Sequence, residues 1–406
     1  MRILISGASI AGPVLAYWLT RYGFEVTVVE RAPTLRKTGG HAVDLFRPSM
    51  QISAQMGVLP QIEALATGTN TMTVYREGVT RPATIDINKL VNAASDQHVE
   101  IMRDDLGEVY YNAGRDHVEY LFGDSITAIS HNGDVTFERG APRRFDVVVG
   151  ADGLHSNVRR LVFGEDAAQT EFLGGYLAVI SAPKTLACDG ESLTHLGAGR
   201  VAMIYTAQPL DDARVVFLFR SKDELQYHYR DVVRQKELLS GVFNGMHPQV
   251  DRWLKEVDAT QAFYFDSITQ LQLDTWSRGR VTLVGDAGYC PGPAVGGSTS
   301  IAVLGAYVLA GELARASGDY ARAFAEYERH MGEPVRRSRA FARAAAKTIV
   351  PGSRAGAWAL TRVGQLISLL PSGVTRAIAK MNTKGARLHD SMPVPDYARM
   401  RERNDR

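Results

Sequence analysis

The most chemically specific residues of this 406-residue chain form three glycine-rich turns, each placed where an apolar segment ends. The first turn, GASIAG at residues 7–12, matches the dinucleotide fingerprint Gly-x-Gly-x-x-Gly except for Ser9 at its middle glycine. Gly7 permits a tight turn, and Gly12 permits close packing of a helix on a strand. Free amides and the helix dipole favour a pyrophosphate at the start of that helix, beside Ser9, Ile10 and Ala11.

An acidic residue follows where ribose binding requires one. Glu30 ends the next apolar segment, where its carboxylate can accept hydrogen bonds from an adenosine ribose. A 2′-phosphate would be repelled by this carboxylate, so the turn favours FAD or NAD over NADP. A generic strand-helix turn is the alternative interpretation, but the strand, helix, strand and acid in register favour a nucleotide.

The second and third turns lie at Asp152-Gly153, within VVVGADGLHS, and after Gly285-Asp286. A carboxylate at the end of a strand, such as Asp286, suits the polyol chain of a flavin. The glycine-rich stretch through Gly296, Gly297 and Ser298 opens another helix, whose amides could face the electron-rich edge of an isoalloxazine ring. Each pair alone is a common turn; their order along the chain makes flavin binding the better interpretation.

The elements that must position these turns are of two kinds. Continuously apolar strands are expected at residues 2–6, 26–30, 145–150 and 280–284, as in a parallel sheet covered on both faces. Between them, residues 169–264 carry β-branched and aromatic strands typical of an antiparallel sheet with one wet face. We therefore predict an α/β fold: a discontinuous Rossmann-like nucleotide-binding domain, an inserted, mainly antiparallel β substrate domain and a C-terminal helical segment. The predicted ranges are 1–75, 99–168 and 275–345 for the first, 76–98 and 169–274 for the second, and 346–406 for the last.

The bulk composition excludes several classes of protein. The net charge is +2, which provides no general field for nucleic acid. Two cysteines, Cys188 and Cys290, indicate no disulfide framework and favour the cytoplasm. No leader peptide and no membrane-spanning segment are expected. No catalytic triad or metal set stands out; the histidines are dispersed, and His41, His155 and His195 are the ones that could approach a pocket.

Taken together, the motifs resemble the single-component FAD-dependent aromatic hydroxylases of the para-hydroxybenzoate hydroxylase type, and most of all their tetracycline-inactivating branch. The matching segments are GASIAG with Glu30-Arg31, GGHAVDL at residues 39–45, RDDL at 103–106, VVVGADGLHS and GDAGYCPGPAVGGS. The resemblance covers about residues 1–65, 100–160 and 280–315. The pair Gly288-Tyr289 and the residues Ser298 and Ser300 depart from the family pattern.

The resemblance implies a role for each matching residue. Glu30 would hold the adenosine ribose, Arg103 the phosphates or ribityl chain, and Asp286 the ribitol. Asp44 would lie near the flavin, and Pro293 and Gly296 would shape the turn at the ring. Asp152-Gly153 would belong to a motif shared by FAD and NAD(P)H, and Arg36 would meet NADPH.

The same resemblance implies a flavin monooxygenase. NADPH or NADH would reduce the FAD, the reduced flavin would capture molecular oxygen as a hydroperoxide, and one oxygen atom would pass to an aromatic or polyketide-like substrate. Water must be excluded from such a site. Tyr176, Met203, Tyr205 and Phe217 of the middle sheet are the candidate substrate contacts, although simple core positions explain them equally well.

Several alternatives stay open from the sequence. A flavin-dependent reductase or oxidase, or a non-catalytic redox sensor, would carry the same flavin motifs, and the chain could be a monomer or a homodimer. Cys290 could be redox-active, though packing explains it better. Apolar residues recur at helical spacing from Trp358 to Leu370. We expect this helix to brace the two domains, with a dimer contact or lid second and a membrane-surface contact third.

Overall fold

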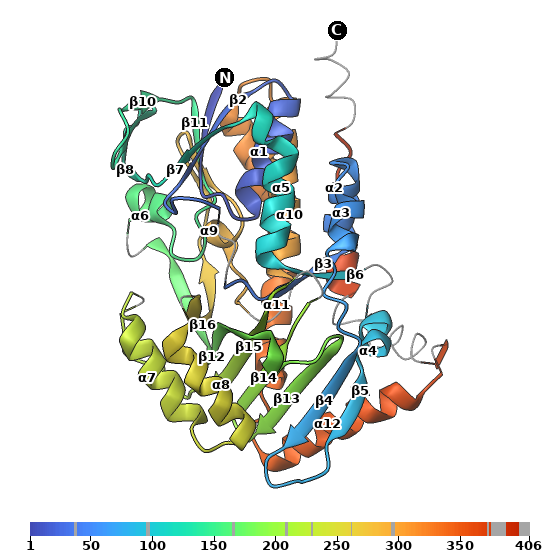
Figure 1. Ribbon diagram of the computed structural model, residues 1–406. Coiled ribbons are helices and arrows are strands. Elements are labelled where there is room, and N and C mark those ends of the chain that lie inside the picture. Colours follow the sequence, from blue (N-terminus) through green and yellow to red (C-terminus); the bar gives the residue numbers. More distant parts are fainter. Residues whose placement is uncertain are drawn as a thin grey trace.

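The computed structural model describes residues 1–35, 39–94, 98–164, 167–207, 210–228, 230–260, 262–293, 297–371, 373–374 and 387–397. In Figure 1 a six-stranded sheet lies above a seven-stranded sheet, and helix α11 (Tyr320–Ile349) passes from the region of the first to the second. The predicted α/β architecture, with a discontinuous Rossmann-like domain, an inserted sheet and C-terminal helices, is confirmed.

The six-stranded sheet assembles segments from three distant parts of the chain. Its order is β17 (Ser277–Arg278), β18 (Val281–Leu283), β11 (Val147–Gly150), β1 (Arg2–Ser6), β2 (Glu25–Glu30) and β7 (Glu119–Phe122). All neighbours from β18 to β7 are parallel, with Ile3 opposite both Val147 and Val26. The continuously apolar strands are buried, as expected for a parallel sheet that is covered on both faces.

Helices α1 (Ala11–Arg21), α5 (Arg103–Gly114) and α10 (Ser298–Arg315) lie side by side next to this sheet (Figure 1). The approach of α1 to the first turn is too close for a side chain, because a Cβ on Gly12 would overlap the carbonyl oxygen of Gly7. Gly7 itself has φ +110°. Both glycines are therefore dictated by backbone geometry.

The seven-stranded sheet is the inserted one. Its order is β16 (Phe263–Gln272), β12 (Gln169–Pro183), β15 (Asp212–Arg220), β14 (Arg200–Tyr205), β13 (Glu191–Gly197), β4 (Thr71–Arg76) and β5 (Ala83–Asp86). Only the β13–β4 pair is parallel among these neighbours. Because β4 begins at Thr71, the predicted boundary at residue 75 falls inside a strand, and we place all of β4 with this sheet.

The expectation of one wet face on this sheet is wrong for its central strands. Helices α7 (Val232–Phe243) and α8 (Pro248–Ala259) cover the outer face, where Phe243, Val250 and Trp253 pack on strand residues such as Phe217. The inner face packs against α11 and α12 (Arg354–Leu369) through Ala342, Ala346, Val350 and Ala357. The strands alternate between two apolar layers, so their outward residues are buried as well.

Smaller elements complete the fold. Strands β3 (Ala42–Phe46) and β6 (His98–Met102) form an antiparallel pair, and β8 (Ile126–Ile129), β9 (Asp134–Phe137) and β10 (Arg143–Arg144) form a three-stranded sheet. The other helices of the described residues are α2 (Arg47–Gln55), α3 (Leu59–Ala64), α4 (Ile87–Ala94), α6 (Asn157–Phe163), α9 (Asp286–Tyr289) and α14 (Arg387–Asp390), with 3-10 turns at Arg115–His117 and Lys184–Leu186. Among the described residues, no helix combines the length and apolar character needed to span a bilayer.

The close contact at the first turn gives a stability prediction. Gly12→Ala forces a methyl group onto the Gly7 carbonyl oxygen, and we expect a loss of at least about 3 kcal/mol in unfolding free energy. Gly241→Ala in α7 is the matched control, because nothing lies within 4 Å of its added Cβ and alanine favours the helix. Urea unfolding measures both, and equal stability of the two variants would contradict the prediction.

Candidate cofactor and active site

The carboxyl ends of the parallel strands bring the predicted cofactor residues to one edge of the sheet. Gly7 follows β1, Glu30 ends β2, Asp152 follows β11 and Asp286 follows β18. Ligands of open α/β sheets bind at this edge, in the crevice where the strand order reverses. β1 lies between β2 and β11 and is the point of that reversal.

The first helix offers an uncapped N-terminus at this edge. Ile10 is the N-cap of α1 and its side chain makes no capping hydrogen bond, so the first amides are left for a ligand. Arg103 donates from Nη2 to Ser9 Oγ over 3.1 Å, which places its guanidinium beside the turn. A cation and free amides together suit a pyrophosphate. The structure thus brings the predicted residues Ser9, Ile10, Ala11 and Arg103 together.

Glu30 is held rigidly beside the same turn. Its carboxylate accepts hydrogen bonds from the amides of Ala8, over 2.9 Å, and Ala32, over 2.8 Å. Its remaining lone pairs can accept from ribose hydroxyls. Arg31 follows it as an exposed side chain. Arg36, predicted to meet NADPH, lies outside the described residues.

Asp152 has a structural task that the sequence motif did not reveal. Its carboxylate accepts from Ser156 Oγ over 2.5 Å and from the amides of Asn157 and Val158 over 2.9 and 3.0 Å, at the start of α6. Burial raises the pKa of this carboxyl, although the three donors oppose the shift. Gly153 has φ +80°, which a glycine adopts without strain. The turn is therefore fixed from within, and its contact with FAD or NAD(P)H stays a prediction.

Asp286 lies at the centre of a charged group. Burial raises the pKa of its carboxyl, while the guanidinium of Arg103 lowers it. Burial also raises the pKa of the Cys290 thiol well above its usual range, and the Asp286 charge adds to the shift. A protonated buried thiol is a poor nucleophile, so Cys290 behaves as a packing residue that donates to Asp286.

The departure at Tyr289 is explained by packing. Tyr327 donates to the Tyr289 hydroxyl over 3.0 Å and sits beside the Leu283 carbonyl oxygen. The Tyr289 ring reaches so close to α10 that a Cβ on Gly305 would overlap its hydroxyl. Tyr289 thereby fastens the end of β18 to α10.

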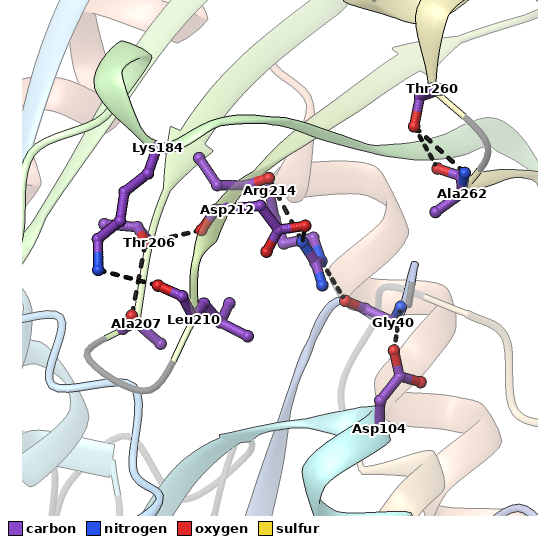
Figure 2. A network of polar contacts seen from close by, with 11 residues as sticks. Gly40, Asp104, Lys184, Thr206, Ala207, Leu210, Asp212, Arg214, Thr260 and Ala262 are labelled. Atoms are coloured by element: carbon purple, nitrogen blue, oxygen red, sulfur yellow. Dashed lines mark hydrogen bonds and ion pairs between the residues drawn. The ribbon is translucent and has the colours of Figure 1, made fainter. Parts of the chain in front are cut away.

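The loop before β3 joins the two halves of the molecule through the peptide of Gly40. The Gly40 amide donates to Asp104 Oδ2 over 2.8 Å, and its carbonyl oxygen accepts from Arg214 Nε over 3.0 Å (Figure 2). Arg214 is 3% exposed and pairs with Asp212 over 2.5 Å. A Cβ on Gly40 would come within 2.6 Å of the Asp104 carboxylate. In the sequence, Arg214 is signalled only as a charge two residues after Asp212 at the start of the apolar strand DARVVFLF.

Polar side chains of β16 face this loop. Tyr264 lies with its ring centroid 6.3 Å from that of His41, and its hydroxyl is 3.4 Å from Asp266 Oδ2. His155 Nε2 lies 3.3 Å from the same carboxylate oxygen. Burial, and then the charge of Arg103, lowers the pKa of His41 to about 4, so its imidazole is neutral near pH 7. Tyr264 and Asp266 were missed from the sequence, where only their alternation on one strand face signals them.

The four candidate substrate residues divide between the two faces of the sheet. Met203 and Tyr205 lie on the inner face, and the Tyr205 hydroxyl accepts from the Ala42 amide over 2.8 Å at the start of β3. Tyr176 and Phe217 lie on the outer face, buried under α7 and α8. We withdraw Tyr176 and Phe217 as substrate contacts, because the thickness of the sheet separates them from the cofactor edge. His195 also lies on that outer face, against Trp253.

Asp44 is part of a polar group on the β3–β6 pair. His98 Nε2 lies 2.6 Å from Asp44 Oδ1. Burial would lower the pKa of His98, but the hydrogen bond and charge of Asp44, with Glu100 and Asp390, outweigh it and raise the pKa. Glu100 is bonded to Thr67, and burial raises its pKa. Asp44 is thus fixed by its own neighbours close to the tail residue Asp390.

The start of α10 is the second uncapped helix N-terminus. Its N-cap Gly297 has φ +83° and no side-chain hydrogen bond caps the helix before Ser298. A Cβ on Gly297 would overlap the ring of His389, which stacks on Phe46 with centroids 5.2 Å apart. Within the described residues neither ring nitrogen of His389 has a partner, and burial lowers its pKa to about 4. Pro293 precedes this bend; Gly296 lies outside the described residues.

These features fit an extended dinucleotide with a flavin. The uncapped helices α1 and α10 both approach Gly285, the charge of Arg103 acts on the neighbouring Asp286, and Gly12 and Gly297 leave no room for side chains of their own. An unpartnered buried imidazole such as that of His389 costs about 1–3 kcal/mol, which a polar ligand atom would offset. No sequence pattern pointed to His389, which lies far along the chain from Gly297.

Comparison with known proteins supports this interpretation. Residues 1–323 match the FAD binding domain family. The chain is 35% identical over 339 residues to a flavin-dependent monooxygenase of Legionella longbeachae serogroup 1 (strain NSW150), covering 80% of this chain and 84% of that protein. It is 41% identical over 334 residues to an uncharacterised protein of Mycobacterium tuberculosis, covering 80% and 88%.

Solved structures agree along nearly the whole chain. The tetracycline destructase Tet(51) superposes with a TM-score of 0.82 and 30% identity, covering 98% of this chain and 99% of that chain. Klebsiella pneumoniae HpxO, solved with FAD and uric acid, superposes with a TM-score of 0.71 at 22% identity, covering 95% and 97%. The second similarity concerns the fold alone.

The Gly40 contacts predict a strong effect at Arg214. Arg214→Met leaves the Gly40 carbonyl oxygen and Asp212 without their donor, and we expect a loss of about 2–4 kcal/mol in unfolding free energy. Arg220→Met at the exposed end of the same strand should change it by less than about 0.5 kcal/mol. Unfolding in guanidinium chloride measures the free energy of unfolding of both variants. A similar loss in both would show that the contacts of Arg214 with Gly40 and Asp212 contribute no more to stability than an exposed arginine does.

The His98–Asp44 pair predicts a pH-dependent contribution to stability. The folded pKa of His98 is raised, so the pair stabilises fully below the ordinary histidine pKa and loses its contribution as the pH rises through the raised value. His98→Gln should therefore destabilise by about 1 kcal/mol at pH 5.5 and by less at pH 9. Thermal unfolding across this range is the measurement. If His98→Gln lowered the stability by the same amount at pH 5.5 and at pH 9, the His98–Asp44 ion pair would be contradicted.

Proposed function

The chain belongs to the FAD binding domain family and its flavin-dependent monooxygenases, and from this premise we propose that it uses NADPH or NADH and molecular oxygen to hydroxylate an aromatic or polyketide-like small molecule. The observation that carries the proposal is the polar wall opposite the cofactor edge. There His41, Tyr264 and Asp266 meet at the junction of the two sheets. Such a wall favours an enzyme with an organic substrate over a redox sensor, and the similarity to a flavin-dependent monooxygenase favours oxygen transfer over simple reduction or oxidation.

Each end of the site has residues suited to one part of FAD. The free amides of α1 and the guanidinium of Arg103 would hold the phosphates, and Glu30 the adenosine ribose. Asp286 would accept from the ribitol hydroxyls, and the start of α10 would face the ring. When bound, the flavin supplies hydride acceptance from the nicotinamide and the activation of oxygen.

The protein's own residues would orient the substrate and exclude water. The neutral imidazole of His41 can accept a hydrogen bond from a phenol or donate one to it, and the Tyr264 ring lies with its centroid 6.3 Å from that of His41. Met203 and Tyr205 stand on the inner sheet face among apolar neighbours, including Val179 and Val216. This apolar layer keeps water from the reacting atoms, which oxygen transfer requires.

Two further assignments rest on the family resemblance and on composition. Arg36 would contact the nicotinamide cosubstrate. Both cysteines are free thiols, Cys188 exposed and Cys290 buried, which supports a reducing cytoplasmic location.

Two structural neighbours at 30% identity are tetracycline destructases, so tetracyclines belong among the substrates to test.

One experiment separates this proposal from a reductase, an oxidase or a redox sensor. The purified protein is loaded with FAD, and oxidation of NADPH and NADH is followed with a panel of phenols, polyketide aromatics and tetracyclines under isotopically labelled oxygen. Labelled oxygen in an organic product supports the monooxygenase. A reduced substrate without the label supports the reductase. Labelled hydrogen peroxide as the sole oxygen-containing product supports the oxidase. No turnover with either nicotinamide supports the redox sensor.

Asp286 gives the sharpest test of cofactor placement. Asp286→Ala removes the acceptor assigned to the ribitol, and we expect FAD affinity to fall about 10- to 100-fold. Asp116→Ala, which removes an exposed carboxylate at the end of α5, is the control and should leave affinity unchanged. Quenching of flavin fluorescence during titration measures both. Unchanged affinity in Asp286→Ala would remove Asp286 from the site.

A further inference from the structure

Helix α12 is built with its small residues inward and its large apolar residues outward. The buried residues of this helix are Ala357, Thr361 and Gly364. A Cβ on Gly364 would come within 2.6 Å of the Ile85 side chain on β5, so the inner face needs a small residue there. Ser368 accepts from the Asp86 amide over 2.9 Å at the same contact. The helix is thereby held tightly against the sheet without using its large side chains.

The outer face of α12 is apolar and open. Trp358 is 52% exposed, Leu366 62% and Leu369 80%, and Leu360 and Val363 are exposed beside them. A surface helix normally buries such residues and turns its polar ones to water. The sequence predicted that this helix braces the two domains, whereas α12 packs with its small residues on β4, β5, β13 and α4, which all belong to the substrate half. In Figure 1 the helix runs along the lower border of the molecule beneath β4 and β5.

The charges of this segment have one sign. Helix α12 contains two arginines and no Asp or Glu, in a protein whose net charge is only +2. On α12 itself Arg354 is exposed, and Arg362 lies over the Trp358 ring at 6.0 Å. An apolar face with Trp, Leu and Arg and without acids is the pattern of a helix that lies in a membrane interface.

We propose that the outer face of α12 docks on an anionic phospholipid surface. The apolar side chains would enter the boundary between head groups and acyl chains, and Arg354 and Arg362 would meet the lipid phosphates. A second copy of the chain fits less well. A symmetric dimer would place two such faces against each other, and their arginines would find no acid on either helix.

The protein has its own reporter for this contact. Trp18, Trp253 and Trp276 are at most 7% exposed, so Trp358 is the tryptophan that meets solvent. We expect the fluorescence of the FAD-loaded full chain to shift to shorter wavelength with vesicles of equal parts phosphatidylcholine and phosphatidylglycerol. Vesicles of phosphatidylcholine alone should bind at least about tenfold more weakly, and added salt should weaken the anionic binding.

A pair of variants tests the face itself. Leu366→Glu with Leu369→Glu places two carboxylates on it and should lower co-sedimentation with the anionic vesicles at least about tenfold. Val233→Glu on α7 is the matched control, because Val233 is 70% exposed on a different helix and should leave binding unchanged. Unchanged FAD loading and circular dichroism in both variants verify the fold.

Other outcomes would overturn the proposal. No shift and no co-sedimentation at low salt would exclude lipid docking, and equal binding to both kinds of vesicle would exclude the role of the arginines. A concentration-dependent dimer by light scattering, abolished by Leu366→Glu with Leu369→Glu, would assign the face to a second copy. None of these readouts depends on turnover, so they stand apart from the test of monooxygenase activity.

Discussion

The peptide of Gly40 is the point on which the relative placement of the two sheets depends. Its amide is held by Asp104 at the start of α5, and its carbonyl oxygen by Arg214 on the seven-stranded sheet. Burying a guanidinium at 3% exposure is unfavourable unless each donor is used, and Asp212 and Gly40 supply the acceptors. His41 and Ala42 follow Gly40 in the chain, and the Ala42 amide donates a hydrogen bond to the Tyr205 hydroxyl. This loop thus ties the cofactor edge to the polar wall formed by His41, Tyr264 and Asp266.

The cofactor edge was predictable because its information is local. A parallel strand shows itself as an apolar run, its end is marked by glycine, and the carboxyl ends of parallel strands must meet at one edge. The sequence around Glu30 and Asp286 was therefore sufficient to predict that both residues lie at this edge. The departures at Tyr289 and Cys290 were visible too, but their meaning needed the neighbours Gly305 and Asp286, which other segments supply.

What the sequence left open is the choice between two faces. Tyr176 and Tyr205 have the same side chain on strands of one sheet, yet only Tyr205 faces the cofactor half. Alternation tells which residues share a face, whereas the helices that cover each face decide which is inner. The same ambiguity applies to α12: the helical spacing of its apolar residues was visible in the sequence, but which face of the helix packs on the protein was not. His389 is beyond local inference, because its contact with Gly297 depends on the path of the tail.

The placement of α12 bears on how substrate would reach the site. α12 packs on β4, β5 and β13, strands of the same sheet that carries Met203 and Tyr205, and stays apart from the six-stranded sheet in Figure 1. α11 joins it to the opposite end of that sheet, where Gln270 of β16 donates to the Arg339 carbonyl oxygen over 2.7 Å. A chain docked through α12 would therefore turn its substrate half toward the lipid. Apolar aromatic molecules concentrate in that boundary layer, so the docked orientation and the chemistry proposed for the site favour the same class of substrate.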